Sequence, residues 1–199
     1  MVEVTSGAGA VSATKRTGMR WYILALVFIV SAVNVADRST MAIGGPAISK
    51  DLGLNASDMG IIFSGFGWAY VLMQIPGGML LDRFGSRMVY AVALTFWSLF
   101  TFLQGFVGFL AGGAAVATFF VLLLFVGAAE SPAMPGNSRV VAAWFPRQER
   151  ATAAAIFNAA QYFATVIFAP IMGWITYRMG WPWIFYMMGV IGFISRGLA

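Results

Sequence analysis

Long apolar runs alternate with short segments of glycine, proline and charged residues along the chain. A helix that crosses the hydrocarbon core of a bilayer needs about 20 mostly apolar residues. By this measure the sequence predicts six membrane-spanning helices, over residues 20–43, 58–80, 87–108, 112–131, 151–175 and 182–199. The last segment is short and ends near Arg196. We expect a helix that is cut short, although a complete short helix whose arginine reaches the interface is the alternative.

The composition supports this interpretation. Of the 199 residues, 60% are hydrophobic and 10% are charged, whereas soluble domains carry about 25% charged residues. A soluble domain of this size could not hide so much apolar surface. The sequence therefore predicts an all-α integral membrane protein, with a cytoplasmic tail over residues 1–19 and one helical bundle over residues 20–199.

The residue types also limit the chemistry. The chain has no cysteine and no histidine, which excludes disulfides, thiolate metal sites and histidine-based catalysis. The sequence contains no nucleotide-binding loop and no nucleophile–base pair. We therefore predict that the protein is not an enzyme and that it needs no metal ion or bound cofactor.

Basic residues orient the predicted helices, because cytoplasmic loops carry an excess of lysine and arginine. Eight basic residues fall on the side of the amino terminus: Lys15, Arg16, Arg20, Arg83, Arg87, Arg139, Arg147 and Arg150. The opposite loops hold only Lys50 and Arg178. The amino terminus is therefore expected in the cytoplasm, and the net charge of +5 reflects these loops instead of a nucleic-acid partner.

Helix 20–43 carries polar residues where a lipid-facing helix would have none. Asn34, Asp37, Arg38 and Met41 recur at spacings that place them on one helical face. A charge near mid-bilayer costs a few kcal/mol and usually faces a bundle interior or a wet cavity. We predict that this face lines a polar cavity. The alternative is an Asp37–Arg38 pair that caps the helix at the outer interface.

A second acid, Glu130, ends the apolar run of helix 112–131. Desolvation favours the neutral form of a carboxylic acid, so Glu130 is a candidate to bind and release protons. The alternative is a structural role in which Arg139 or Arg147 holds the carboxylate. Asp37 and Glu130 each lie in the first helix of a three-helix set, which is typical of transporters built from two inverted repeats.

Weaker polar signals lie in two other helices. Asn158 and Gln161 share a face of helix 151–175, and Tyr70 lies within helix 58–80. Such groups can line a hydrophilic cavity or form hydrogen bonds between helices, and the sequence leaves both open. Gly60 and Ser64 suggest a close helix-packing contact.

Three connecting segments have distinct features. Residues 44–60 hold glycine and proline before Ser57, a candidate N-cap of helix 58–80. Two prolines in residues 130–139 should break the preceding helix. Residues 77–88 contain the pattern G-x-x-x-D-R-x-G-x-R, formed by Gly78, Asp82, Arg83, Gly85 and Arg87.

The last pattern resembles the loop between helices 2 and 3 of the major facilitator superfamily. Most of residues 34–175 resemble its anion:cation symporter branch, and most closely the bacterial glucarate/galactarate permeases, with hexuronate and galactonate permeases nearby. The stretches that carry the resemblance are "NVADRSTMAIGGPAISKDLGL", "MGIIFSGFGWAYVLMQIPGGMLLDRFGSR", "GAAESPAMPGNSRVVAAWFPRQERATA" and "FNAAQYFATVIFAPIMGWI". The chain would be the amino-terminal half of such a fold.

The resemblance implies proton-coupled uptake of a sugar-acid anion by alternating access across a bacterial inner membrane, driven by the proton gradient. It implies proton roles for Asp37 and Glu130, and substrate contacts from Arg38, Tyr70, Gln161 and Asn158. Gly78, Asp82, Arg83, Gly85 and Arg87 would belong to an inner gating loop. A carboxyl-terminal half would be the partner that completes the cavity.

The sequence departs from this pattern in two ways. Similar proteins usually place an arginine two turns before the acid of helix 4, where this chain has Leu123. They also have twelve helices. A truncated, non-transporting membrane remnant or a regulator is therefore the alternative function.

Overall fold

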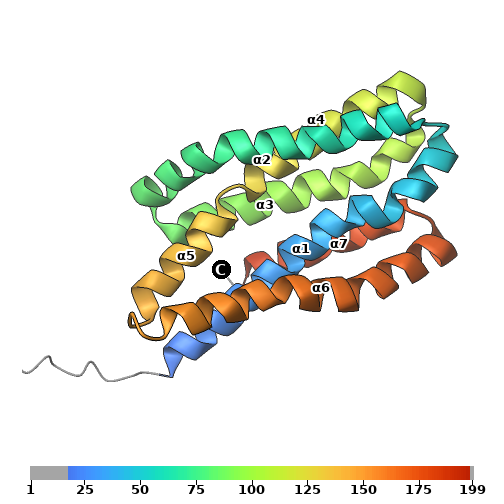
Figure 1. Ribbon diagram of the computed structural model, residues 1–199. Helices are drawn as coiled ribbons and strands as arrows, with labels where there is room; N and C mark the ends of the chain where they lie inside the picture. The colour runs from blue at the N-terminus through green and yellow to red at the C-terminus, as the bar shows by residue number, and fades with distance from the viewer. Residues whose placement is uncertain (1–17, 198–199) are drawn as a thin grey trace, which may run out of the picture.

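The computed structural model describes residues 18–197, and this part of the chain is built from helices without a strand (Figure 1). The elements are α1 (Met19–Leu52), α2 (Ala56–Phe84), α3 (Ser86–Gln104), the 3-10 helix η1 (Gly105–Phe109), α4 (Gly112–Glu130), α5 (Ala133–Trp144), α6 (Arg150–Met179) and α7 (Pro182–Arg196). Residues 1–17 of the predicted tail lie outside the described residues, and Met19 already belongs to α1.

Five segments of the described chain are long and apolar enough to cross a membrane, namely 19–52, 56–84, 86–109, 112–144 and 150–179. The sixth predicted helix corresponds to α7, which is apolar but has only 15 residues. The all-helical fold class is therefore confirmed.

Helix α1 extends beyond its predicted end at residue 43 and continues to Leu52, through Gly44, Gly45 and Pro46. The two glycines are buried. A Cβ atom at Gly44 would lie 2.9 Å from the side chain of Ile184, so a glycine here allows α7 to pack closely. Tertiary packing has therefore overridden three residues, two glycines and a proline, that usually interrupt a helix.

The amino-terminal cap of α2 also differs from the prediction. The cap is Asn55 and not Ser57: the Asn55 side chain accepts a hydrogen bond from the Asp58 backbone N–H, and Asp58 accepts one from the Asn55 N–H. This reciprocal capping box satisfies two backbone donors at once. Ser57 could not form such a box, because the residue three positions after it is Gly60, which has no side-chain acceptor.

The predicted break after helix 4 is confirmed at Ser131–Pro132, but the chain then forms α5, a helix that the sequence analysis treated as a loop. Pro135 lies in the first turn of α5, where a missing backbone N–H costs no intrahelical bond. The connection between α2 and α3 is also shorter than expected, because Gly85 alone joins the two helices with a φ of +77°.

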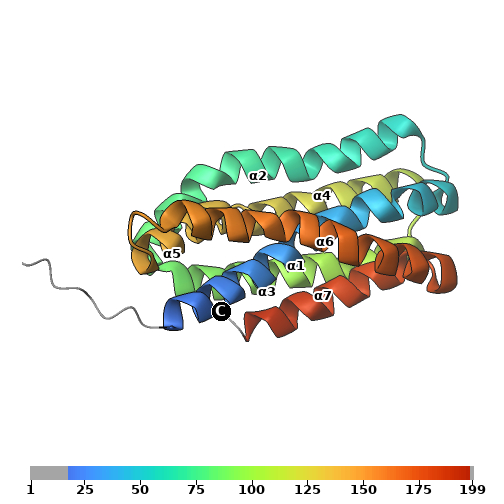
Figure 2. The ribbon, with the colours of Figure 1, turned by 60° about the horizontal axis from the view of Figure 1, so that its bottom comes forward.

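Three helix pairs make most of the tertiary packing: α1 with α6, α2 with α4, and α3 with α7 (Figures 1 and 2). Suppose that α1 changes places with α4, α2 with α6, and α3 with α7. The pair α1–α6 then becomes the pair α4–α2, and the pair α3–α7 stays the same. This exchange is the arrangement expected of two inverted three-helix repeats related by a pseudo-two-fold axis.

Small residues set the α2–α4 contact. A Cβ atom at Gly127 would lie 2.5 Å from the Phe66 carbonyl oxygen, and one at Gly65 would lie 2.7 Å from the Phe120 carbonyl oxygen. The predicted pair Gly60 and Ser64 is wrong as a packing contact, because nothing lies within 4 Å of a Cβ atom at Gly60.

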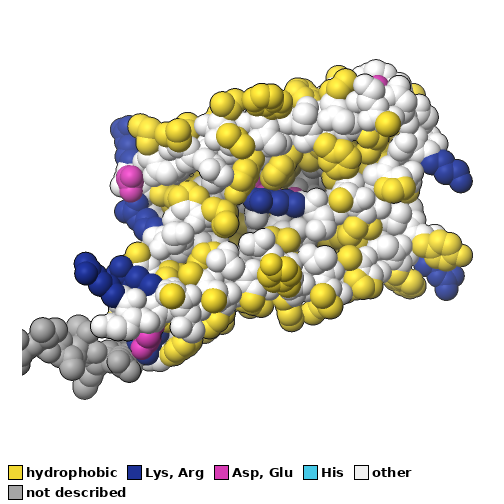
Figure 3. Space-filling model, in the orientation of Figure 1, with side chains coloured by type: hydrophobic (Ala, Val, Ile, Leu, Met, Phe, Trp, Pro, Cys, Tyr) yellow, Lys and Arg dark blue, Asp and Glu magenta, His cyan; other side chains and the backbone are white. Residues whose placement is uncertain are grey.

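The outer surface is mostly apolar along the length of the bundle. Large side chains such as Trp68, Ile75, Met79 and Val166 are more than half exposed, which suits contact with lipid. Basic side chains gather at the two ends of the molecule, and charged atoms also show in a hollow at mid-length (Figure 3). That hollow is where the polar residues of the sequence meet.

Candidate functional site

The centre of the bundle holds an ion pair between α1 and α4. Arg38 Nε donates to Glu130 Oε2 at 2.7 Å, and the Glu130 side chain is fully buried whereas that of Arg38 is 31% exposed. The alternative in which Arg139 or Arg147 holds Glu130 is therefore wrong. When Glu130 is ionised it needs a paired cation, because an isolated charge in an apolar interior is very costly, and Arg38 supplies one.

Asp37 lies beside this pair and is held by α3. Its Oδ2 accepts hydrogen bonds from Trp97 Nε1 at 2.5 Å and from Thr101 Oγ1 at 2.9 Å. The alternative of a simple Asp37–Arg38 pair capping α1 at an interface is also wrong, since Asp37 is buried and α1 continues beyond it to Leu52. Asp37 and Glu130 also lie within interaction range of each other.

The guanidinium of Arg38 packs on aromatic rings of α2. Its carbon lies 4.4 Å from the Tyr70 ring centroid and 5.2 Å from that of Phe66, and the two rings stack on each other. A cation over an aromatic face is attracted by the ring quadrupole. The structure thus brings together Arg38 and Tyr70, two of the predicted substrate-contact residues, and adds Phe66.

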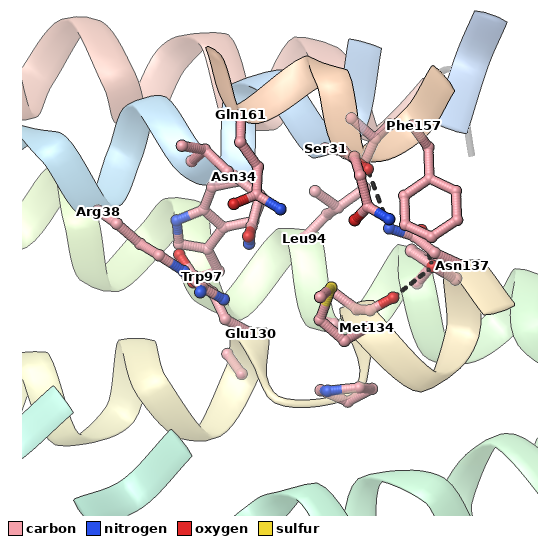
Figure 4. A pocket seen from close by; sticks show the side chains of 18 residues that line it. Ser31, Asn34, Arg38, Leu94, Trp97, Glu130, Met134, Asn137, Phe157 and Gln161 are labelled. Atoms are coloured by element: carbon pink, nitrogen blue, oxygen red, sulfur yellow. Dashed lines mark hydrogen bonds and ion pairs between the residues drawn. The ribbon is translucent and has the colours of Figure 1, made fainter. Parts of the chain in front are cut away.

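A first cavity, of about 100 Å³, opens from the ion pair toward the end of the bundle where α1 begins (Figure 4). We call it the Asn34 cavity. Its polar lining includes Ser31, Asn34, Arg38, Tyr90, Glu130, Asn137, Asn158 and Gln161. The predicted residues Asn158 and Gln161 of α6 therefore face the same space as Arg38 and Glu130, which supports the cavity interpretation over helix–helix hydrogen bonding.

The far wall of the Asn34 cavity contains a hydrogen-bond network that the sequence analysis missed. Asn137 of α5 donates to Ser31 Oγ at 2.9 Å and accepts from Tyr90 Oη at 2.5 Å. Tyr90 Oη also lies 3.0 Å from the Ala133 carbonyl oxygen. Because the sequence predicts a connecting segment over residues 130–139 and not a helix, it does not place Asn137 on a helical face.

A second cavity, of about 90 Å³, lies on the other side of the charged residues, toward the opposite end of the bundle. We call it the Gln104 cavity. It is lined by Asp37, Arg38, Met41, Phe63, Phe66, Thr101, Gln104, Leu123, Val126 and Phe185. Met41 and Leu123 face this space, so the position where similar proteins usually carry an arginine shares a cavity with Asp37. Arg38 lines both cavities and separates them.

None of the residues of the predicted loop 77–88 lines either cavity. Asp82 at the end of α2 forms an ion pair with Arg139 of α5, and both side chains are exposed. Arg83 lies over the ring of Phe84, and Arg87 is exposed in the first turn of α3. Gly78 lies within α2. The pattern therefore ties α2 to α5 and does not reach the charged centre.

Within residues 18–197 no group of three or more histidine, cysteine, aspartate or glutamate side chains is arranged to hold a metal ion. The charged centre offers two carboxylates and one guanidinium instead.

A family model for the Major Facilitator Superfamily matches residues 27–198. The chain belongs to this superfamily. Among curated proteins it is 55% identical over 185 residues to the "Probable galactarate/D-glucarate transporter GudP" of Escherichia coli (strain K12), and 51% identical over 187 residues to the protein of the same name from Bacillus subtilis (strain 168). These alignments cover 93% and 94% of this chain, but only 41% of each relative.

A more distant relative, the D-galactonate transporter of Escherichia coli O6:H1, is 36% identical over 184 residues, which is 92% of this chain and 41% of that protein. Among solved structures, a bacterial homolog of the human lysosomal transporter Spinster, inward-facing and occupied, matches with a TM-score of 0.73 at 20% identity. That match covers 89% of this chain and 43% of the other and confirms the fold alone.

The comparisons confirm the resemblance noted from the sequence. The chain spans about 41% of the length of the curated relatives and corresponds to the amino-terminal half of the superfamily fold. Since these relatives are transporters by name, the comparisons also place the chain in a transporter family and not in an enzyme family.

Proposed function

We propose that this chain supplies the amino-terminal half of a proton-coupled transporter for a sugar-acid anion of the glucarate or galactarate type. The observation that carries the proposal is the Arg38–Glu130 ion pair, which lies at mid-bundle and faces a polar cavity. The relatives named galactarate/D-glucarate transporters support the substrate class.

Arg38 is the candidate ligand of a substrate carboxylate. A guanidinium can bind a carboxylate through two parallel hydrogen bonds, and Arg38 is held in place by the rings of Tyr70 and Phe66. The amides of Asn34, Asn158 and Gln161 line the same cavity. Amides donate and accept hydrogen bonds, so they suit the hydroxyl groups of a sugar acid.

Glu130 is the candidate coupling acid. While it is ionised, it occupies the Arg38 Nε–H. Protonation removes its negative charge and frees the guanidinium for the substrate carboxylate, and loss of the proton restores the pair and displaces the substrate. Proton and anion therefore bind together, which is the requirement for symport.

The groups that surround Glu130 define how this exchange depends on pH. Asp37 and Arg38 face it from α1, and Tyr90 of α3 lines the same cavity. Tyr70 of α2 lies against the Arg38 guanidinium. The α6 amides in the cavity, Asn158 and Gln161, are uncharged. Asp37, as the second buried carboxylate, is the candidate for a second proton site.

The basic loops support a location in a bacterial inner membrane, with the amino terminus in the cytoplasm. In that orientation the Asn34 cavity opens toward the cytoplasm and the Gln104 cavity toward the outside. The Asp82–Arg139 pair, with Gly78, Arg83, Gly85 and Arg87, would then form the cytoplasmic gate of the transport cycle.

The test is uptake of radiolabelled D-glucarate into proteoliposomes with an imposed proton gradient. Two preparations are compared: the 199-residue chain alone, and the same chain fused to the carboxyl-terminal part of the Escherichia coli GudP relative. Uptake that rises with the proton gradient in the fused protein, and that Glu130→Gln makes independent of the gradient, supports the proposal.

Asp51→Asn provides the matched control, because Asp51 is an exposed carboxylate outside both cavities. The amide oxygen of an asparagine can still accept the hydrogen bond that Trp181 donates to Asp51, so this variant should keep gradient-driven uptake. Absence of uptake in both preparations, with correctly folded protein, contradicts the proposal and favours the alternative of a non-transporting remnant or regulator.

A further inference from the structure

A groove on the outer surface of the bundle runs between α2, α3 and α4. Its volume is about 480 Å³, and the side chains that line it are all apolar. Along α3 these side chains recur at every fourth position, which places them on one helical face: Met88, Val92, Phe96 and Phe100. The first three are about half exposed, so the groove is open to the surrounding bilayer. We call it the Phe96 groove.

The dimensions of the Phe96 groove are those of a lipid chain in one leaflet. From Met88 to Phe100 helix α3 rises by about 18 Å, and the hydrocarbon of one leaflet is roughly 15 Å thick. The rings of Phe96, Phe100 and Phe125 stack in a row, with centroids 6.1 Å and 4.9 Å apart. A groove of this length with a wall of flat rings fits an acyl chain that lies along α3.

One end of the Phe96 groove carries a positive charge. Phe84 lines the groove at the end of α2, and the guanidinium carbon of Arg83 lies 5.4 Å from the centroid of the Phe84 ring. Asp82, the neighbouring acid, is paired with Arg139, and no ion pair among the described residues occupies Arg83. Because a guanidinium matches the oxygens of a phosphate group, this end suits a phospholipid headgroup.

We propose that the Phe96 groove binds an anionic phospholipid of the phosphatidylglycerol class, with one acyl chain along α3 and the phosphate on Arg83. In the orientation given under the proposed function, this lipid belongs to the cytoplasmic leaflet. The groove has no polar side chain that could orient a protein partner, whereas hydrocarbon along its length and a cation at one end match the two parts of a phospholipid. A zwitterionic headgroup carries its own cation, so Arg83 favours a lipid with a net negative charge.

The groove shares a wall with the candidate functional site. Ala93, Ala129 and Pro132 line both the Phe96 groove and the Asn34 cavity. Ala129 directly precedes Glu130, and Pro132 lies at the break between α4 and α5. An acyl chain in the groove therefore packs against the back of the wall that carries Glu130, so the lipid supports the geometry of the ion pair from outside the cavity.

The experiment is native mass spectrometry of the purified, delipidated 199-residue chain, titrated with dioleoyl phosphatidylglycerol or with dioleoyl phosphatidylcholine, which has the same acyl chains. We expect the first phosphatidylglycerol to bind about fivefold more tightly, the factor expected of one arginine near a membrane surface. Arg83→Gln should remove most of this preference. Arg147→Gln is the matched control and should keep it, because Arg147 is exposed and lies outside the groove.

Val92→Trp tests the groove itself. The larger side chain fills the space beside Phe96 and should weaken the binding of both lipids by about tenfold, because several methylene groups lose their burial. Val71→Trp is the matched control, since Val71 is 65% exposed on α2 and does not line the groove. Thermal unfolding shows whether each variant is folded, and Met88→Trp is the second filling variant.

Three results would overturn the proposal. Equal affinity for the two lipids removes the role of the headgroup, and an equal loss in the two arginine variants reduces it to general charge attraction. Unchanged lipid binding by a folded filling variant places the lipid elsewhere. A dimer that forms in place of the lipid complex also overturns it, and identifies a second copy of the chain as the occupant. Because the assay measures lipid binding and not uptake, its failure leaves the proposed function untouched.

Discussion

Two of the arginine–carboxylate pairs among the described residues differ in their surroundings. Arg38–Glu130 lies at mid-bundle with a fully buried carboxylate. Arg139–Asp82 lies at the end of the bundle, with side chains that are 43% and 80% exposed. Exposed pairs contribute at most about 1 kcal/mol, because water screens them. A buried pair cannot lose one partner without stranding the other charge.

The comparison shows that burial, and not the residue types, decides what an ion pair can do. At the surface, either partner can turn to water, so the contact can form and break at little cost. In the interior, only a proton or another ion can replace a partner. This difference agrees with the roles proposed above, in which the central pair couples proton and anion binding and the terminal pair belongs to a gate.

The largest effect is expected from Arg38→Ala. Removing the guanidinium strands the Glu130 carboxylate, which should destabilise the fold by about 3–5 kcal/mol. Thermal or denaturant unfolding in detergent measures the change. Arg139→Ala is the matched control and should have little effect. The double variant Arg38→Ala/Glu130→Gln should recover most of the loss. Equal destabilisation by the two arginine variants would show that burial does not distinguish the pairs.

Trp97→Phe should have the next largest effect. It removes the indole N–H that donates to Asp37 Oδ2 and leaves a buried carboxylate oxygen with one donor fewer. A lost hydrogen bond to a buried group costs about 1–3 kcal/mol, which the same unfolding experiment measures. Trp68→Phe, at a residue 66% exposed on α2, serves as the control. If both substitutions cost the same, the Trp97 hydrogen bond contributes nothing of its own.

Gly85→Ala should have the third largest effect on stability. It tests the backbone conformation at the connection between α2 and α3, near the Asp82–Arg139 ion pair. Gly85 has a φ of +77° and a ψ of 160°, a region that essentially only glycine adopts, and a residue with a Cβ atom there costs roughly 1–3 kcal/mol. Gly78→Ala is the matched control, because Gly78 lies within α2 and a Cβ atom added there would meet nothing within 4 Å; it should be neutral or slightly stabilising. A lower melting temperature for Gly78→Ala than for Gly85→Ala would refute this account.

The smallest effect is expected from Asp82→Asn. The Asp82–Arg139 pair is exposed, so its loss should reduce stability by less than about 1 kcal/mol, and added salt should remove even this difference. Unfolding at low and high salt measures both. A large loss that persists at high salt would mean that this pair behaves like the buried one.

The sequence predicted which residues would be polar within the bundle but not how they pair. Asp37, Arg38 and Glu130 stand out because charges are rare in apolar segments. Their partners do not: Glu130 is 92 positions from Arg38, and Trp97 and Thr101 lie in a helix that looks like an ordinary membrane span. Such contacts depend on how α1, α3 and α4 pack against one another. The residues next to each position in the sequence do not reveal this packing.

The helix ends were predicted less well than the helices themselves, for a related reason. Glycine and proline at residues 44–46 interrupt an isolated helix, but here Gly44 lets α7 pack closely and α1 continues. Similarly, the helix is interrupted at Pro132 as expected, whereas Pro135 is tolerated in the first turn of α5. Local preference and tertiary packing compete at these positions, and packing decides.

The single-residue joint at Gly85 has a mechanical consequence. On one side of it Asp82 contacts Arg139, and on the other Tyr90 contacts Asn137, so α5 is bonded to both helices that meet there. A one-residue connection leaves no chain length to absorb a rotation of α2, so α2 and α3 are expected to move largely together. Helix α5, bonded on both sides of the connection, holds their ends together at this rim of the molecule.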